Sequence, residues 1–244
     1  MSPVGMHTIL EIAAYSIGFR LFLRERQRLS LSALADRDHS LWIGVAAILG
    51  AAIGAKLAYW LEDPLHAFAA FPDWRHLLEG KSIVGALLGG LLGVEITKSL
   101  IGVRSSSGDA FVPGLLVGIA IGRVGCFLAG LDDHTYGIPT TLPWGVDFGD
   151  GVPRHPTQLY EIGFLIALAV LLYRKGRANA LPGTRFRQFM LGYLSFRLCV
   201  DFIKPMPFVY FGIFSGIQLL CVAGMLYYRR DVVDLLRRGS WAPS

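Results

Sequence analysis

A single arginine, Arg123, lies where the sequence is otherwise apolar. It stands near the end of the run 111–129, with Gly122 and Gly125 close by. A charged side chain at membrane depth costs at least a few kcal/mol by insertion scales, so such a residue is by default part of a functional site. A structural ion pair inside a helical bundle, or a side chain that extends to the membrane interface, would explain one isolated arginine about as well.

A second arginine, Arg197, belongs to a constellation with Tyr193 and Asp201 at four-residue spacing. Successive members of such a series are rotated by only about 40° around a helix, so the three share one face. Arg197 and Asp201 can form an ion pair, which would reduce the cost of burial. Two guanidinium groups in a low-dielectric pocket would bind phosphate, because arginine offers planar, bidentate donors and stays charged.

The segment that follows Arg154 opens another apolar stretch with polar residues. His155 followed by Pro156 predicts a helix start, with His155 as N-cap and Pro156 at the first helical position. Gln158 and Glu161 then lie on one face of the helix, and a buried polar face at the outer end of a membrane helix indicates a wet cavity. We predict that five side chains meet in one cavity in the outer half of the bilayer, open to lipid from the side: Arg123, Arg197, Tyr193, His155 and Gln158.

The composition indicates which elements position these residues. Of the 244 residues 53% are hydrophobic and 17% are charged, and several apolar runs approach or exceed the ~18 residues typical of a membrane-spanning helix. We predict an all-α polytopic membrane protein with a single transmembrane domain over residues 1–244. Seven transmembrane helices are expected near 7–23, 40–61, 82–102, 109–130, 157–173, 186–203 and 207–228.

Basic residues are distributed unevenly between the loops that connect these spans. Fifteen arginines and lysines fall on one set of loops and four on the opposite set, and the positive-inside rule makes the richer set cytoplasmic. The N-terminus is then outside and the C-terminus cytoplasmic. The net charge of +5 is therefore a topology signal, and we expect no nucleic acid among the partners. Because arginines follow the first apolar run, we predict a retained span there rather than a signal peptide.

Glycine spacing predicts how two of the spans pack. Small residues at four-residue intervals allow helix backbones to approach closely, and the third and fourth spans each carry such a ridge. We expect these two spans to pack against each other along Gly85, Gly89 and Gly93 of one and Gly114, Gly118 and Gly122 of the other.

A connection of about 26 residues separates the fourth and fifth predicted spans. It mixes acidic and aromatic side chains with apolar ones such as Leu142 and Val146. A loop of this length in a compact domain is usually either functional or disordered. The mixture favours an ordered outer-face loop at about 131–156 that lies at the lipid headgroups.

Polar residues in the first and last spans extend the candidate site. Glu11 and Tyr15 share a face of the first span, and His7 lies one turn earlier on the same side. This face either turns toward a polar cavity or belongs to a mildly amphipathic interfacial helix. Gln218 is a polar position in the last span.

The cysteines give no sign of a disulfide or a metal site. All three fall in predicted spans, and their spacing matches neither a disulfide framework nor a zinc motif: Cys126, Cys199 and Cys221. No glycine-rich nucleotide loop is evident in the sequence. We therefore predict neither a metal nor a cofactor.

These residues resemble the prolipoprotein diacylglyceryl transferase family, seven-span enzymes of the bacterial inner membrane. The family signature Gly-Arg-x-Gly-Asn-Phe is similar to residues 122–127, and its His-Pro-Ser-Gln-Leu-Tyr-Glu run is similar to residues 155–161. Its Tyr-x3-Arg-x3-Glu pattern in the sixth span is similar to Tyr193, Arg197 and Asp201. The resemblance covers the span count, the N-out topology and most of the chain.

The chain departs from the family pattern at several positions. The family's third-span His-Gly-Gly, whose His is implicated as the base, corresponds to Val84-Gly85-Ala86, which has no titratable group. The signature Asn is Cys126, and a Glu expected shortly after it aligns near Leu131, with Asp132 and Asp133 adjacent. The first span lacks the family's Arg-Trp-Tyr-Gly. This pattern is typical of a divergent branch, so a different acceptor is one of the alternatives.

The resemblance implies transfer of a diacylglyceryl group from phosphatidylglycerol to the cysteine thiol of a prolipoprotein lipobox, with release of glycerol phosphate. The expected partners are phosphatidylglycerol, the prolipoprotein and membrane lipid, and the expected location is the bacterial inner membrane. We expect four catalytic residues, Arg123, Arg197, Tyr193 and His155. The residues expected to bind substrate are Gly122, Gly125, Gln158, Tyr160, Glu161, Asp201, Glu11, Tyr15, Asp132 and Gln218.

The identity of the base is left open by the sequence. A free thiol has a pKa of about 8.5, and two nearby guanidinium groups would lower it. A dedicated base is then either dispensable or replaced by His155, His7 or Glu11.

Two other functions are compatible with the sequence. A catalytically weak or inactive homologue that binds anionic phospholipid or a lipoprotein would explain the missing third-span His. A transporter or channel would also place charges inside the membrane. Charges concentrated toward one leaflet, together with a polar outer loop, suit chemistry at lipid headgroups better than transport.

Overall fold

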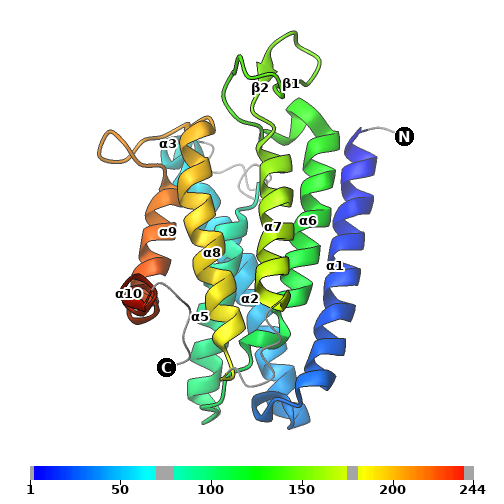
Figure 1. Ribbon diagram of the computed structural model, residues 1–244, viewed down its shortest axis with the longest axis vertical. Helices are drawn as coiled ribbons and strands as arrows, with labels where there is room; N and C mark the ends of the chain where they lie inside the picture. Colours follow the sequence, from blue (N-terminus) through cyan, green and yellow to red (C-terminus); the bar gives the residue numbers. More distant parts are fainter. Residues whose placement is uncertain (1–2, 70–79, 175–180, 239–244) are drawn as a thin grey trace. The chain divides into compact units, whose positions relative to one another are not determined.

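The computed structural model describes residues 3–69, 80–174 and 181–238 and consists mainly of α-helices (Figure 1). Five helical segments are long and apolar enough to cross a membrane: Gly5–Leu29, Arg37–Glu62, Ile83–Leu100, Gly108–Asp133 and Thr157–Arg174. They coincide with the first five predicted spans. An all-α membrane protein is therefore confirmed.

The last two predicted spans correspond to shorter helices, α8 (Thr184–Val200) and α9 (Gly216–Tyr227). The 12 residues of α9 rise only about 18 Å, less than the ~30 Å hydrocarbon core of a bilayer. This helix begins nine residues later than the predicted start at 207. The reason is local: the Tyr210 carbonyl closes a turn by accepting the N–H of Phe214 at 3.0 Å, and Ser215 then caps the helix through a capping box with Gln218.

The described helices belong to two compact units. The first contains Met1–Ser30, Ser107–Gly192 and Phe202–Pro205. The second contains Leu31–Ser106, Tyr193–Asp201 and Met206–Ser244. Residues of α8 up to Gly192 therefore count with the first unit, and those from Tyr193 count with the second. The prediction of one domain over 1–244 stays a prediction.

In the first unit, α1 (Pro3–Leu29), α6 (Val112–Ala129) and α7 (Thr157–Arg174) lie side by side (Figure 1). The backbones of α1 and α6 approach so closely that a Cβ on Gly114 would overlap the carbonyl of Gly18. The short helix η2 (Gly108–Ala110) precedes α6, and its Asp109 accepts hydrogen bonds from the N–H groups of Gly183 and Phe186 at 2.7 and 2.8 Å.

In the second unit, α2 (Arg37–Glu62) packs along α5 (Ile83–Leu100). Gly50 and Gly54 of α2 face Gly85 and Gly89 of α5, and a Cβ on any of the four would overlap backbone atoms of the other helix. Helix α9 also contacts this pair. The helices α3 (Pro64–Ala69) and α10 (Arg229–Arg238) complete the described part of the unit, together with η1 (Ser32–Leu34) and η4 (Asp201–Ile203), the latter belonging partly to each unit.

The predicted packing of the third span against the fourth was wrong. The glycine ridges do form close helix contacts, but the α5 ridge meets α2 and the α6 ridge meets α1. The reason is that α1 and α2 carry small residues of their own, which the prediction did not pair with either ridge. At Gly122, the last member of the α6 ridge, an added Cβ would meet nothing within 4 Å.

The connection between α6 and α7 is held by its own hydrogen bonds. It contains η3 (Gly130–Asp133) and the antiparallel strands β1 (Val146–Asp147) and β2 (Pro153–Arg154). Asp147 Oδ1 accepts three N–H groups of residues 149–151 at 2.8–3.1 Å, which closes the turn between the strands. Arg154 donates from both terminal nitrogens to the two carboxylate oxygens of Asp150, each at 2.7 Å.

Candidate functional site

The buried arginine of α6 forms an ion pair with α7. Arg123 Nε lies 2.9 Å from Oε2 of Glu161, and the two residues are only 6% and 3% exposed. Arg123 also donates from Nη1 to the Sγ of Cys126 at 3.7 Å, one turn further along α6. Because a guanidinium is planar, these two contacts fix its orientation.

Gln158 precedes Glu161 by one turn on α7 and is 1% exposed. Both atoms of its side-chain amide are buried, and neither finds a hydrogen-bond partner among the residues that the structure describes. An unsatisfied buried polar group costs about 1–3 kcal/mol, so natural proteins rarely keep one without a bound water or ligand. Arg123 and Glu161 therefore form a buried polar pair in the first unit, and Gln158 adds a buried amide one turn from Glu161 on α7. These groups suit an anionic or hydroxyl-bearing ligand.

The arginine of α8 has its own network in the second unit. Arg197 donates from Nη2 to Asp201 Oδ1 at 3.0 Å, and the Ser215 hydroxyl donates to the other oxygen of Asp201 at 2.5 Å. The Gln218 amide accepts the N–H of Ser215 at 2.9 Å and donates to the Leu198 carbonyl at 3.2 Å. Gln218 thus bonds to the protein at both ends, and its predicted role in substrate binding stays a prediction.

The five predicted cavity residues are divided between the units. Arg123, His155 and Gln158 belong to the first unit, whereas Tyr193 and Arg197 belong to the second. Tyr193 is fully buried on α8, one turn before Arg197. The convergence of all five on one cavity stays a prediction.

His155 lies just before α7, which begins at Thr157. The Pro156 carbonyl accepts the N–H of Tyr160 at 3.2 Å, so Pro156, rather than His155, is the N-cap. His155 Nδ1 lies 3.1 Å from the Tyr160 hydroxyl, which also accepts a hydrogen bond from Trp144 Nε1 at 2.8 Å. These contacts tie the connection between α6 and α7 to the start of α7.

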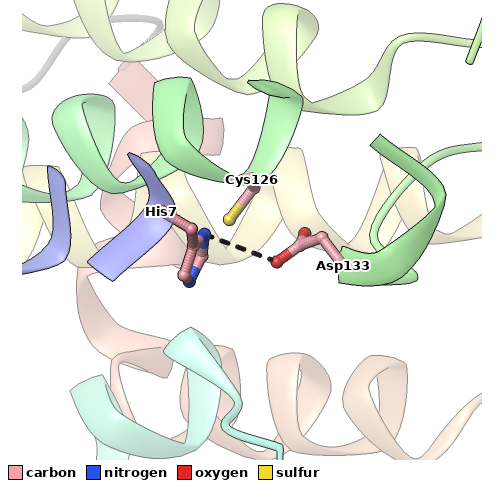
Figure 2. Close-up of side chains that lie close together, drawn as sticks. All are labelled: His7, Cys126 and Asp133. Carbon is pink, nitrogen blue, oxygen red and sulfur yellow. Dashed lines mark ion pairs between the residues drawn. The ribbon is translucent and has the colours of Figure 1, made fainter. Parts of the chain in front are cut away.

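A further group of side chains gathers where α1, α6 and η3 meet (Figure 2). His7 Nδ1 lies 4.0 Å from Asp133 Oδ1. The Cys126 side chain points toward the same place, and the three ligand atoms lie within 4.8 Å of one another. The sequence does not predict this group, because its members are separated by up to 126 positions and match no metal spacing. The one sequence signal for this group is Cys126, which stands where the family signature has Asn.

The comparisons with known proteins decide the family. A model of the prolipoprotein diacylglyceryl transferase family matches residues 2–228. This chain belongs to that family. Among curated relatives, the phosphatidylglycerol–prolipoprotein diacylglyceryl transferase of Geobacter sulfurreducens is 36% identical over 224 residues, covering 86% of this chain and 80% of the relative. Proteins of the same name from Bordetella bronchiseptica and Nitratidesulfovibrio vulgaris are each 33% identical over 205 residues. The two alignments cover 78% and 76% of this chain, and 75% and 72% of the respective relatives.

The structure shows the surroundings of the residues at which this chain differs from the family pattern. At the position of the family's third-span His, this chain has Val84, which is fully buried on α5 and cannot titrate. On α1, the Tyr15 hydroxyl donates to Glu11 Oε1 at 3.0 Å, and the Tyr15 side chain is 66% exposed. Asp132 is exposed on η3, next to the half-buried Asp133. The exposure of Tyr15 and Asp132 leaves both accessible to a substrate.

Proposed function

We propose that this chain transfers the diacylglyceryl group of phosphatidylglycerol to the cysteine thiol of a lipobox-containing prolipoprotein. The observation that carries the proposal is the buried Arg123, which is held by Glu161 of α7. One turn before Glu161 lies the buried amide of Gln158, which finds no partner among the described residues. A cation fixed in an apolar helix bundle suits an anionic lipid headgroup. The named relatives support this substrate, since their names specify phosphatidylglycerol and prolipoprotein.

The reaction is a displacement at carbon. The acceptor thiolate attacks the glyceryl carbon that carries the phosphate, so an S–C bond forms as the C–O bond to phosphate breaks. The electron pair of that C–O bond leaves with glycerol phosphate, which gains one negative charge. The thiol proton is released to a base or to solvent. The acceptor becomes a diacylglyceryl thioether.

Arginine side chains contribute most where this negative charge develops. Arg123 is assigned to the phosphodiester and to the leaving phosphate, with its guanidinium plane fixed by Glu161. Arg197 is assigned the same kind of role in the second unit, held by Asp201 and Ser215. Tyr193 and His155 are also assigned to catalysis. The residues assigned to substrate binding are Glu11, Tyr15, Gly122, Gly125, Asp132, Gln158, Tyr160, Glu161, Asp201 and Gln218.

The acceptor thiol needs little help from a base. Guanidinium groups beside a thiol with a pKa of about 8.5 stabilise its thiolate and lower that pKa. This accounts for Val84 at the position of the family's third-span His. His155, His7 and Glu11 are the side chains available to take up the proton.

The membrane topology completes the proposal. We place seven spans in the bacterial inner membrane, with the N-terminus outside and the C-terminus cytoplasmic. The uneven distribution of basic residues supports this orientation. The segment 131–156 then forms an outer-face loop above the lipid headgroups, in a single transmembrane domain.

One assay tests the proposal. Purified protein in phosphatidylglycerol nanodiscs is incubated with a lipobox peptide, and the peptide is analysed for the mass of a diacylglyceryl thioether. The proposal expects this product, and it expects none from a matched peptide with Ser in place of the lipobox Cys. A modified Ser peptide would contradict thiol chemistry.

The second candidate, an inactive homologue, is favoured by Val84 alone. It predicts saturable binding of phosphatidylglycerol without transfer to any thiol peptide. A related alternative is a transferase with a different acceptor, which would consume phosphatidylglycerol in the presence of other thiol peptides but leave the lipobox peptide unmodified.

A further inference from the structure

Three side chains of the first unit converge on one another, and the proposed transfer uses only one of them, His7, as a candidate base. His7 comes from α1, Cys126 from α6 and Asp133 from η3, and one ligand atom of each lies within 4.8 Å of the other two (Figure 2). His7 Nδ1 is buried and makes no hydrogen bond within the described part of the chain. We propose that these three residues bind a divalent transition-metal ion of the zinc class.

The geometry needs only small side-chain movements to bind such an ion. Tetrahedral zinc holds a thiolate at ~2.3 Å and nitrogen or oxygen at ~2.0–2.2 Å, which places neighbouring ligand atoms about 3.3–3.7 Å apart. His7 Nδ1 and Asp133 Oδ1 are 4.0 Å apart. All three separations are at most 4.8 Å, so rotations of the side chains are enough to bring the three atoms to one ion. Three protein ligands also leave one coordination position for water or another small ligand.

The charges favour a divalent ion. A thiolate and a carboxylate carry two negative charges, and the imidazole ligand is neutral, so a divalent ion makes the cluster neutral. Neutrality matters because uncompensated charge is costly in an apolar environment. On binding, the Cys126 thiol releases its proton to solvent as the sulfur–metal bond forms. Thiolate and imidazole together select zinc-class ions over Mg²⁺ and Ca²⁺, which prefer oxygen ligands.

Neighbouring groups orient two of the three ligands. The Thr135 hydroxyl donates to Asp133 Oδ2, which leaves Oδ1 facing His7. The Thr135 carbonyl in turn accepts a hydrogen bond from the Thr157 hydroxyl at 2.6 Å. Arg123 donates to the sulfur of Cys126 at 3.7 Å, which holds that side chain in place. Such outer partners hold ligands ready for a metal.

The arrangement does not fit a Cys-His-Asp nucleophilic triad. In a triad the imidazole stands between the carboxylate and the nucleophile, which are separated by the ring and two hydrogen bonds. Here the Cys126 sulfur and the Asp133 carboxylate lie within 4.8 Å of each other as well as of His7. A triangle of ligand atoms is the geometry that a single ion requires.

Cobalt provides a direct probe of the sulfur ligand. Full-length protein, with any affinity tag removed, is titrated with Co²⁺ in detergent, and thiolate-to-cobalt charge transfer is followed in the near ultraviolet. We expect a band that saturates at about one Co²⁺ per chain and is displaced by Zn²⁺. The band should vanish in Cys126→Ser. Binding should weaken at least tenfold in His7→Gln and Asp133→Asn.

Matched variants separate the cluster from other groups of the same kind. Cys199→Ser removes an exposed thiol of α8, and Asp132→Asn removes the adjacent carboxylate; both should retain the wild-type band and affinity. Thr135→Val should lower Zn²⁺ affinity by roughly 10–100-fold, because it releases Asp133. Unchanged circular dichroism shows that each variant is folded. No band in the wild type, or a band that survives Cys126→Ser or is unaffected by both His7→Gln and Asp133→Asn, overturns the proposal.

Discussion

Arg123 and Glu161 form a buried ion pair that joins α6 to α7, with 2.9 Å between Arg123 Nε and Glu161 Oε2. This pair explains how a charged residue is accommodated in an apolar helix. Burying two charges is costly, and the attraction between them offsets that cost only while both partners are present. The same contact fixes the guanidinium that we assign to the lipid phosphate.

Removing the carboxylate should destabilise the protein strongly. Glu161→Leu leaves Arg123 as an uncompensated buried charge, and breaking a buried pair in this way typically costs about 3–5 kcal/mol. The double variant Arg123→Met with Glu161→Leu should recover most of that loss, because no buried charge remains. Thermal unfolding in detergent measures both. A double variant no more stable than Glu161→Leu alone would show that the ion pair is not the source of the loss.

Substitution within the α2–α5 contact should also destabilise. An Ala at Gly89 places its Cβ against the backbone of Gly50 and Gly54, and overpacking of this kind costs about 1–3 kcal/mol. Gly44→Ala on α2 is the matched control, since its Cβ would meet nothing within 4 Å, and it should leave the thermal midpoint unchanged or raise it slightly. Equal midpoints for the two variants would contradict the close contact.

The turn between β1 and β2 should open in acid. Hydrogen bonds from Arg154 hold the pKa of Asp150 below its ordinary value of 3.8. A lowered carboxyl pKa in the folded turn contributes stability that is fully present above 3.8 and is lost as the pH falls through the lowered value. Hydrogen exchange of the 147–154 amides should therefore accelerate below pH 3.8, after correction for intrinsic rates.

Asp150→Asn is the control for the acid-induced opening. It cannot titrate at this position, so its exchange should be faster at neutral pH and should lose the acid-induced step. Identical pH profiles for the variant and the wild type would show that the Asp150–Arg154 pair does not hold the turn.

Much of the helical architecture could be predicted from the sequence, because long apolar runs leave few alternatives. The fifth span, predicted at 157–173, is α7 at Thr157–Arg174. The last span was less predictable. Its apolar composition continues through residues 207–215, but a backbone turn and the Ser215 cap end that continuity. Because hydropathy is averaged over a window of residues, it cannot locate a helix start that a single capping residue sets.

Pairing between distant elements was the part that the sequence could not supply. The glycine ridges of α5 and α6 predicted close packing, yet spacing along one helix carries no information about the partner helix. The same limit hid the cluster of His7, Cys126 and Asp133, whose members come from three elements. By contrast, the Arg197–Asp201 pair was foreseeable, because both residues lie one turn apart.

The central claim is that phosphate stabilisation by arginine, rather than a histidine base, dominates the transfer. Loss of one electrostatic stabiliser of a transition state typically costs on the order of 10²–10³ in rate, whereas an acidified thiol gains less from a base near neutral pH. Rates of lipobox-peptide modification should therefore be measured for four variants side by side: Arg123→Ala, Arg197→Ala, His155→Ala and His7→Ala. Both arginine variants should lose transfer, and both histidine variants should only slow it. A His155→Ala protein as inactive as the arginine variants, although folded, would contradict the account and assign the base to His155.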